Sequence, residues 1–119
     1  MENIEETLAN LVNTVPGTTI AALLGLDGVG VQMALSDAWQ DVDQDVIEIE
    51  LAALAEAIQK TAGRLQVGPS PEFFLSTAQA SFLGAMVGPA HFLVLGLEPS
   101  GDLEQAGAAL GKAQEALAG

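Results

Sequence analysis

The stretch Val15–Leu35, VPGTTIAALLGLDGVGVQMAL, decides the fold of this chain. Its segment Thr18–Leu26 is apolar after the two threonines, and a strand that is apolar on both sides must be covered on both sides. Asp27-Gly28 is the strongest short hairpin signal, because both central residues of a type I′ turn need positive φ. Apolar residues then alternate with small or polar ones from Val29 to Leu35. The stretch therefore predicts a β-hairpin whose first strand is central in a sheet sandwiched between helices.

The remaining elements follow from hydrophobic periodicity and turn signals on either side of this hairpin. Helices are predicted at Asn3–Thr14, Asp43–Gln66 and Gly101–Ala118, and further strands at Glu72–Ala78, Ser81–Val87 and His91–Leu97. The order is αββαβββα, an α+β arrangement. A five-stranded antiparallel sheet with helices on both faces satisfies it, in a single domain spanning residues 1–119.

Each predicted helix has a cap and an apolar stripe. Capping residues are expected at Asn3, Asp45 and Ser100. The stripe that should face the core is Ile47, Leu51, Leu54, Ile58 and Leu65 in the long helix, and Leu103, Ala106, Leu110 and Leu117 in the last one.

The back of the long helix carries unusually little charge. Ile49 points nearly opposite the core, and a second stripe contains Val46, Ala53, Ala57 and Arg64. A helix with a solvated back would be mostly charged there, whereas small residues beside an outward isoleucine permit close approach of another helix. The alternative is that these alanines are simply good helix formers.

Composition excludes several classes of function. Half of the residues are hydrophobic, which argues against disorder. The net charge of −13, with three basic against sixteen acidic residues, disfavours nucleic acid and anionic membranes as partners. It indicates a solvated acidic surface or a partner with a basic patch. With no cysteine, no basic signal segment and no long apolar run, a cytoplasmic location is expected and membrane insertion is not.

No motif predicts catalysis, a cofactor or a metal. Gly107–Lys112 has one residue too few for a phosphate-binding loop, and Asp41–Asp45 lacks the glycine and glutamate of a calcium loop. His91 is the sole histidine and is expected to be structural. Trp39, the only tryptophan, either covers one end of the core or serves as an exposed interface anchor. We therefore expect a protein that is not an enzyme.

The chain resembles the roadblock/dynein light chain family, in particular its bacterial MglB-like members. The matching features are a helix ending in Val15-Pro16-Gly17, an apolar strand running into Leu26-Asp27-Gly28, the long central helix, and the strand His91–Leu97 leading into a final helix. The resemblance spans nearly the whole chain and implies the roadblock fold, which is similar to profilin and longin domains.

The resemblance also implies a homodimer. In family dimers the third strands pair across the two-fold axis and the long helices pack together. Here that edge would be formed by Phe73, Phe74 and Leu75. An uncharged aromatic edge strand is independently an aggregation liability unless another strand pairs with it.

Family members regulate Ras-like small GTPases. By resemblance, the partner surface would be lined by Ile49, Ala53, Ala57, Lys60 and Arg64, and the dimer would remodel the GTPase without inserting a catalytic arginine. Two alternatives remain open. One is a structural or adaptor dimer in a larger complex, with no effect on GTP hydrolysis. The other is a sensor that binds a small ligand in a pocket among the small residues.

Overall fold

The computed structural model describes residues 3–118. In chain order its elements are α1 (Ile4–Thr14), β1 (Thr18–Gly25), β2 (Gly30–Leu35), the short 3₁₀ turn η1 (Asp37–Trp39), α2 (Gln44–Arg64), β3 (Glu72–Ser76), β4 (Ser81–Val87), β5 (His91–Leu97) and α3 (Leu103–Ala118). This order confirms the predicted αββαβββα arrangement. None of the three α-helices within this range combines the length and apolar character that a bilayer crossing requires.

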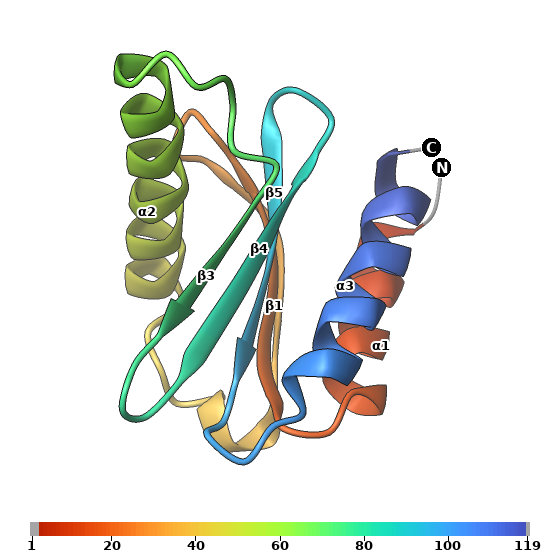
Figure 1. Cartoon of the computed structure of the whole chain (residues 1–119). Helices are drawn as coiled ribbons and strands as arrows, with labels where there is room; N and C mark the ends of the chain where they lie inside the picture. Colours follow the sequence, from red (N-terminus) through yellow and green to blue (C-terminus); the bar gives the residue numbers. More distant parts are fainter. Residues whose placement is uncertain (1–2, 119) are drawn as a thin grey trace.

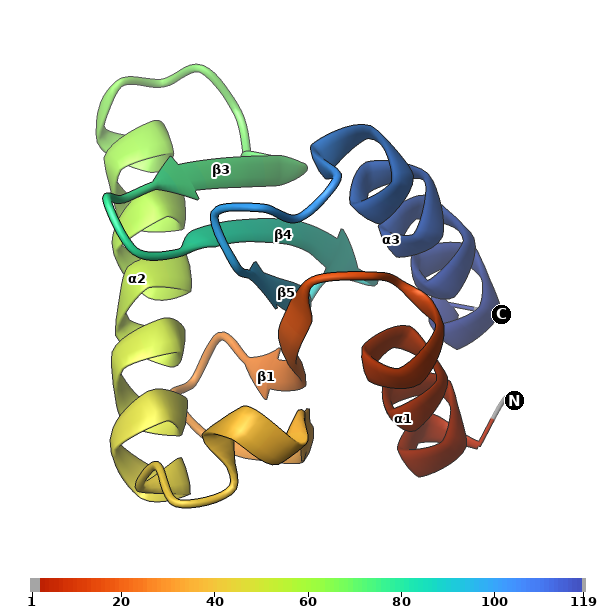
Figure 2. The same cartoon turned by 90° about the horizontal axis from the view of Figure 1, so that it is seen from below.

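The five strands form one antiparallel sheet in the order β2-β1-β5-β4-β3. Helix α2 lies on one face, and α1 and α3 lie side by side on the other (Figure 1; Figure 2). Strand β1 has neighbours on both sides, and all eight of its residues are buried. The prediction of an inner strand covered on both faces is therefore confirmed.

Alternate residues of β1 supply two separate cores. Ile20, Ala22 and Leu24 pack in the layer beneath α2, with Phe92 and Val94 of β5 among their neighbours. The intervening residues, Ala21 and Leu23, belong to the layer beneath α1 and α3. Because side chains of a strand alternate between the faces of a sheet, an unbroken apolar run is what a strand with two cores requires.

The β1–β2 turn is longer than the predicted two-residue hairpin. The Gly28 N–H donates to the Gly25 carbonyl at 3.1 Å, and the Asp27 carboxylate accepts from the Val29 N–H at 3.0 Å. Gly28 has φ of +91°, whereas Asp27 does not have positive φ. A type I′ turn needs positive φ at both positions, so that part of the prediction is wrong. The register of the hairpin shifts between Leu23 and Leu24 to absorb the longer loop.

Helix α2 is capped by a different residue from the one predicted. The Asp43 carboxylate accepts from the Asp45 N–H at 3.0 Å and the Val46 N–H at 3.4 Å, so Asp43, not Asp45, is the N-cap. Glu48 is therefore free to point toward the sheet, where its carboxylate accepts from the Gly30 N–H at 3.0 Å. This bond ties the first turns of α2 to the start of β2.

Of the predicted caps of the other two helices, one is confirmed and one is wrong. The Asn3 side chain accepts from the Glu6 N–H at 3.1 Å, which confirms the predicted cap of α1. Ser100 does not cap α3; the Asp102 carboxylate does, by accepting from the Gln105 N–H at 3.1 Å. The helix consequently starts at Leu103, two residues later than expected.

The burial of three residues differs from what the predicted core-facing stripes required. Leu65 is 67% exposed, because α2 ends at Arg64 and the chain turns away there. Leu103 is 44% exposed, because it lines a hollow between the first turn of α3 and the sheet. Ala52, which the predicted core-facing stripe of the long helix does not include, is buried at 1% exposure. The buried line of α2 is thus rotated toward Ala52 and Ala55, and strand β3 ends at Ser76, before the predicted Ala78.

Gly17, next to the first helix, is expected to be intolerant of a side chain. Its φ is +84°, and a Cβ there would lie 2.7 Å from the Cα of Gly101. We expect Gly17→Ala to lower the free energy of unfolding by about 2–4 kcal/mol, from left-handed strain plus overpacking against backbone. Urea unfolding measures this change. Gly107→Ala is the matched control: a Cβ there meets no atom within 4 Å, so we expect stabilisation by about 1 kcal/mol. If Gly17→Ala unfolded at the same urea concentration as the parent, the claim that position 17 cannot accept a side chain would be contradicted.

Candidate functional site

Strand β3 forms one edge of the sheet, and its outer side is uncovered. Within residues 3–118 it pairs with β4 alone. The Pro71 carbonyl accepts from the Met86 N–H of β4, and the Glu72 carbonyl accepts from the Ser70 hydroxyl instead of from β4. Since backbone groups alternate in direction along an antiparallel strand, the amide and carbonyl of Phe74 point outward from the sheet.

The side chains of this strand are apolar and accessible. Phe74 is 54% exposed and Leu75 is 39% exposed. Phe73 is half-buried, with its ring 5.6 Å from that of Phe92 and lying over Gly84, which has no side chain to hinder it. The predicted dimer-edge residues therefore lie together on one open strand, and this strand carries no charge after Glu72.

The opposite edge of the sheet, β2, has a backbone group at each end occupied by a side chain. Its first N–H, on Gly30, donates to Glu48, and its last carbonyl, on Leu35, accepts from the Gln40 side-chain amide at 2.8 Å. Side chains that occupy edge groups in this way hinder strand addition at the two ends of β2. Of the two edges in the described part of the chain, the aromatic strand β3 is the one whose central residues are apolar and exposed.

Helix α2 covers only part of its face of the sheet. It packs on β1 and β2, so that Phe73 of β3 and Phe82 and Met86 of β4 are only partly buried on this side. Apolar hollows remain along the flank of α2. One of about 200 Å³ is lined by Ile20, Trp39, Val46, Ile47, Glu50, Leu51 and Phe82, and one of about 360 Å³ by Ala57, Ile58, Thr61, Ala62, Leu65, Val67 and Ser70.

Trp39 lies in η1 at the end of this layer. Its side chain is half-buried and packs against the core beneath α2 while lining the smaller hollow. Of the two interpretations of the only tryptophan, the structure supports a cover at the end of the core over a freely exposed anchor.

The predicted partner-surface residues are all exposed on the side of α2 away from the sheet. Ile49 is 60% exposed, and Ala53, Ala57, Lys60 and Arg64 are also exposed. Of the two cations, Lys60 forms an i,i+4 ion pair with Glu56 at 2.6 Å, and Arg64 is the last residue of the helix. The structure thus brings the five residues onto one surface, and their role in binding stays a prediction.

Two exposed apolar residues beside this surface were missed. Leu65 and Val67, at 67% and 72% exposure, follow the end of α2, where Gln66 takes a positive φ of 59°. They border the larger hollow next to β3. The only sequence signal for their exposure was the position of the helix end. The sequence pattern does not show whether a leucine is the last residue of a helix or the first residue after it.

Titratable side chains do not assemble into a metal site in residues 3–118. No three acidic or histidine side chains gather there in an arrangement that could hold a metal ion. His91 opens β5 and is half-buried.

Comparison with known proteins identifies the fold. No family model and no curated protein matches the chain. Among solved structures, Myxococcus xanthus MglB matches with a TM-score of 0.85 at 19% identity, covering 97% of this chain and 91% of that one. An MglB described as having a tetrameric arrangement gives 0.82 at 21% identity, covering 95% and 83%. A Roadblock/LC7 domain from Streptomyces avermitilis gives 0.78 at 20% identity, covering 97% and 94%. The chain has the roadblock fold seen in MglB, as the sequence resemblance implied.

Proposed function

We propose that this chain forms a homodimer through β3 and α2, and that the dimer regulates a Ras-like small GTPase. The observation that carries the proposal is the half-covered sheet. Its α2 face is open over β3 and β4, next to the aromatic edge strand β3. A second copy joined at that edge would bring its own α2 beside the first and cover both open halves at once.

The centre of β3 suggests the register of this pairing. Phe74 is the middle residue of a five-residue strand, and its amide and carbonyl point outward. Antiparallel pairing about Phe74 would let the two copies exchange a pair of backbone hydrogen bonds there. It would also set Glu72 of each copy opposite Ser76 of the other, so that no carboxylates meet.

The outer surface of α2 would then bind the GTPase. It offers the apolar side chain of Ile49 beside small residues, and isolated apolar groups of this kind serve as anchors in protein interfaces. The chain has a single arginine, Arg64, among its three basic residues. Acceleration of hydrolysis would come from stabilising the GTPase conformation that is competent for hydrolysis, through preferential binding to it.

The structural neighbours support this proposal at the level of fold. Two are MglB proteins, and one of these is described as tetrameric, which is compatible with self-association on such a fold. Identities near 20% do not carry a partner across to this chain, so the GTPase is tested directly.

The test is single-turnover hydrolysis of GTP by a Ras-like GTPase encoded next to this protein's gene. We expect faster hydrolysis in the presence of the dimer. The hydrolysis rate should reach a plateau once all of the GTPase is bound to the dimer. Binding without acceleration would favour an adaptor dimer. If no neighbouring GTPase binds the dimer, and none hydrolyses GTP faster in its presence, the proposal is contradicted.

Arg64→Ala separates remodelling from direct catalysis. We expect the maximal hydrolysis rate at saturating dimer to stay within about twofold of the parent, with only a higher half-saturating concentration. A catalytic arginine contributes about 10³-fold or more, so a collapse of the maximal rate would contradict remodelling. Lys112→Ala is the control, because Lys112 is an exposed cation on α3 in the other layer.

A further inference from the structure

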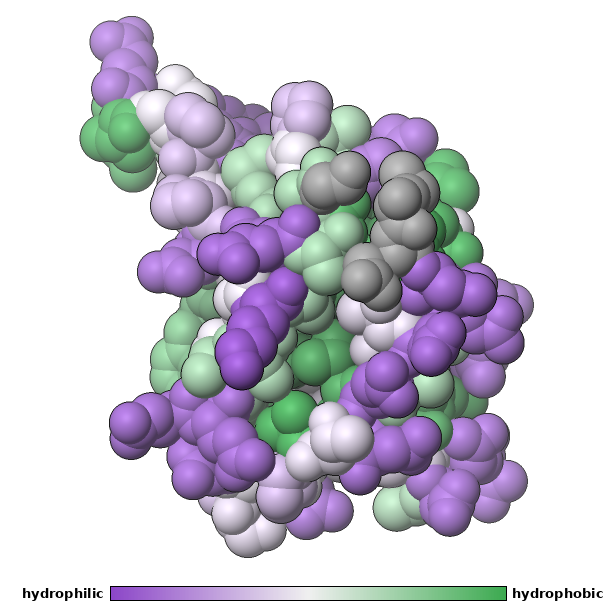
Figure 3. Space-filling model, turned by 90° about the vertical axis from the view of Figure 1, so that its right-hand side faces the viewer, coloured by the Kyte–Doolittle hydropathy of each residue, from purple (hydrophilic) through white to green (hydrophobic). Residues whose placement is uncertain are grey.

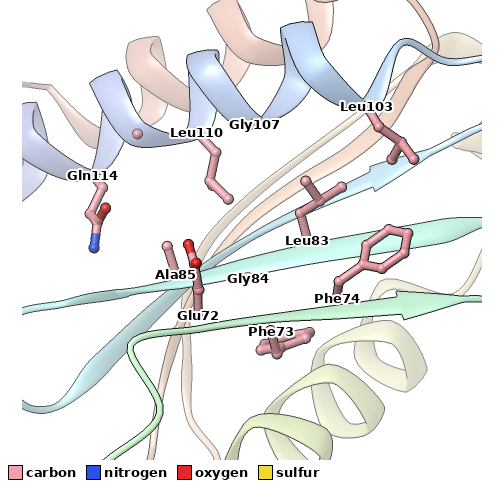
Figure 4. Close-up of a pocket in the computed structure, with 11 residues that line it drawn as sticks. Glu72, Phe73, Phe74, Leu83, Gly84, Ala85, Leu103, Gly107, Leu110 and Gln114 are labelled. Atoms are coloured by element: carbon pink, nitrogen blue, oxygen red, sulfur yellow. The ribbon is translucent and has the colours of Figure 1, made fainter.

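A groove lies between α3 and the outer half of the sheet, on the face opposite α2. It is a hollow of about 490 Å³. Figure 4 shows Phe74 and Glu72 of β3 and Leu83 of β4 pointing up from the sheet toward Leu103 and Leu110 of α3. Its far end is closed by Gln114, whose side-chain amide donates to the Met86 carbonyl at 2.6 Å.

The helical wall of the groove contains two glycines. Gly107 and Gly111 are one turn apart in α3, and both line the hollow. A Cβ on either one meets no atom within 4 Å, so packing within this chain does not require glycine at these positions. Each costs the helix about 1 kcal/mol relative to alanine. Together they let another backbone approach α3 closely.

The charges beside the groove are negative. Glu72 projects into it from β3 (Figure 4). Glu104 and Glu115, both exposed, are three turns apart on the flank of α3 that continues from the two glycines. The groove has no lysine or arginine in its described lining. Figure 3, which views the α1 and α3 side, shows hydrophilic residues over most of that surface with hydrophobic ones between them.

We propose that this groove binds a basic amphipathic helix of another protein. The apolar floor would take the apolar face of such a helix, and the carboxylates would pair with its lysines or arginines. From Leu103 to Gln114 the wall is about 16 Å long, which matches three helical turns. A second copy of this chain offers few partners for these carboxylates, because it has only three basic residues. The site is independent of the GTPase surface on α2.

The probe is a fluorescein-labelled 18-residue peptide of leucine and lysine with its leucines on one helical face. Fluorescence anisotropy should give saturable binding. A leucine–glutamate peptide of the same pattern, and a leucine–lysine peptide of scrambled order, should bind at least about tenfold more weakly. Equal binding of the scrambled peptide would reduce the interaction to charge alone and overturn the proposal.

Gly111→Leu fills the groove and should weaken binding by at least about tenfold. Because leucine is a better helix former than glycine, urea unfolding should show no loss of stability, which separates this result from misfolding. Gln105→Leu, exposed on the far side of α3, is the matched control and should bind as the parent does. Unchanged affinity in Gly111→Leu would overturn the proposal. The proposal would also be overturned if the parent protein had a solution mass above that of a dimer and this mass decreased in Gly111→Leu. A second copy of the chain would then be the occupant of the groove.

Discussion

Replacing Phe74 with aspartate is expected to reduce the mass of the protein in solution from that of a dimer to that of the 12.2 kDa chain, or to make it insoluble. Phe74 is 54% exposed at the centre of the open edge strand. In a pair formed about this residue, two carboxylates would face each other where two aromatic rings had been buried. Like charges directly opposite each other destabilise a strand pair.

The size of the effect follows from burial. Two phenylalanines lose about 3–6 kcal/mol of hydrophobic stabilisation, which corresponds to a dissociation constant raised by about 10²–10⁴-fold before repulsion is counted. Light scattering at micromolar concentration measures the mass. Val31→Asp is the matched control: Val31 is a 45% exposed valine on β2, the edge that the proposed interface does not use, and this variant should stay dimeric. A monomeric parent, or a dimeric Phe74→Asp, would contradict the proposed interface.

Much of the fold could be predicted because the apolar pattern of one strand constrains the arrangement of the elements around it. An unbroken apolar strand such as β1 needs two neighbours and two covering layers, and the helices on either side of it supply those layers. The features that could not be predicted depend on single-residue boundaries. Asp43 and Asp45 are both good caps, and the structure uses Asp43, while the Glu48 carboxylate accepts from the Gly30 N–H of β2.

The candidate surfaces were predictable to a lesser extent. The apolar back of α2 and the aromatic β3 were visible as departures from the expected charge of a solvated face. The groove beside α3 was not, because Leu103 fits the stripe of buried residues in sequence and is exposed in the structure only because the first turn of α3 overhangs the hollow. Likewise, the open half of the sheet depends on where α2 crosses it, and periodicity carries no information about that.

Ile49→Glu is expected to weaken the binding of the GTPase, and so the acceleration of GTP hydrolysis at a given dimer concentration, while leaving the dimer and the fold intact. Ile49 is 60% exposed on the side of α2 away from the sheet, and glutamate is a good helix former, so the free protein tolerates the change. Burying an isoleucine against a partner contributes about 1.5–3 kcal/mol, and an unpaired carboxylate buried in its place adds a desolvation cost. Together these should raise the half-saturating dimer concentration by at least about 10- to 100-fold.

The control for this variant is Ala108→Glu, which adds the same charge to an exposed position of α3 in the other layer. It should leave acceleration unchanged, because it alters net charge without touching α2. Light scattering of both variants shows whether they remain dimers. A monomeric Ile49→Glu would assign Ile49 to the contact between copies. Unchanged acceleration by a dimeric Ile49→Glu would remove this surface of α2 from the GTPase interface, because an isoleucine at the centre of that contact cannot be exchanged for a carboxylate without loss of affinity.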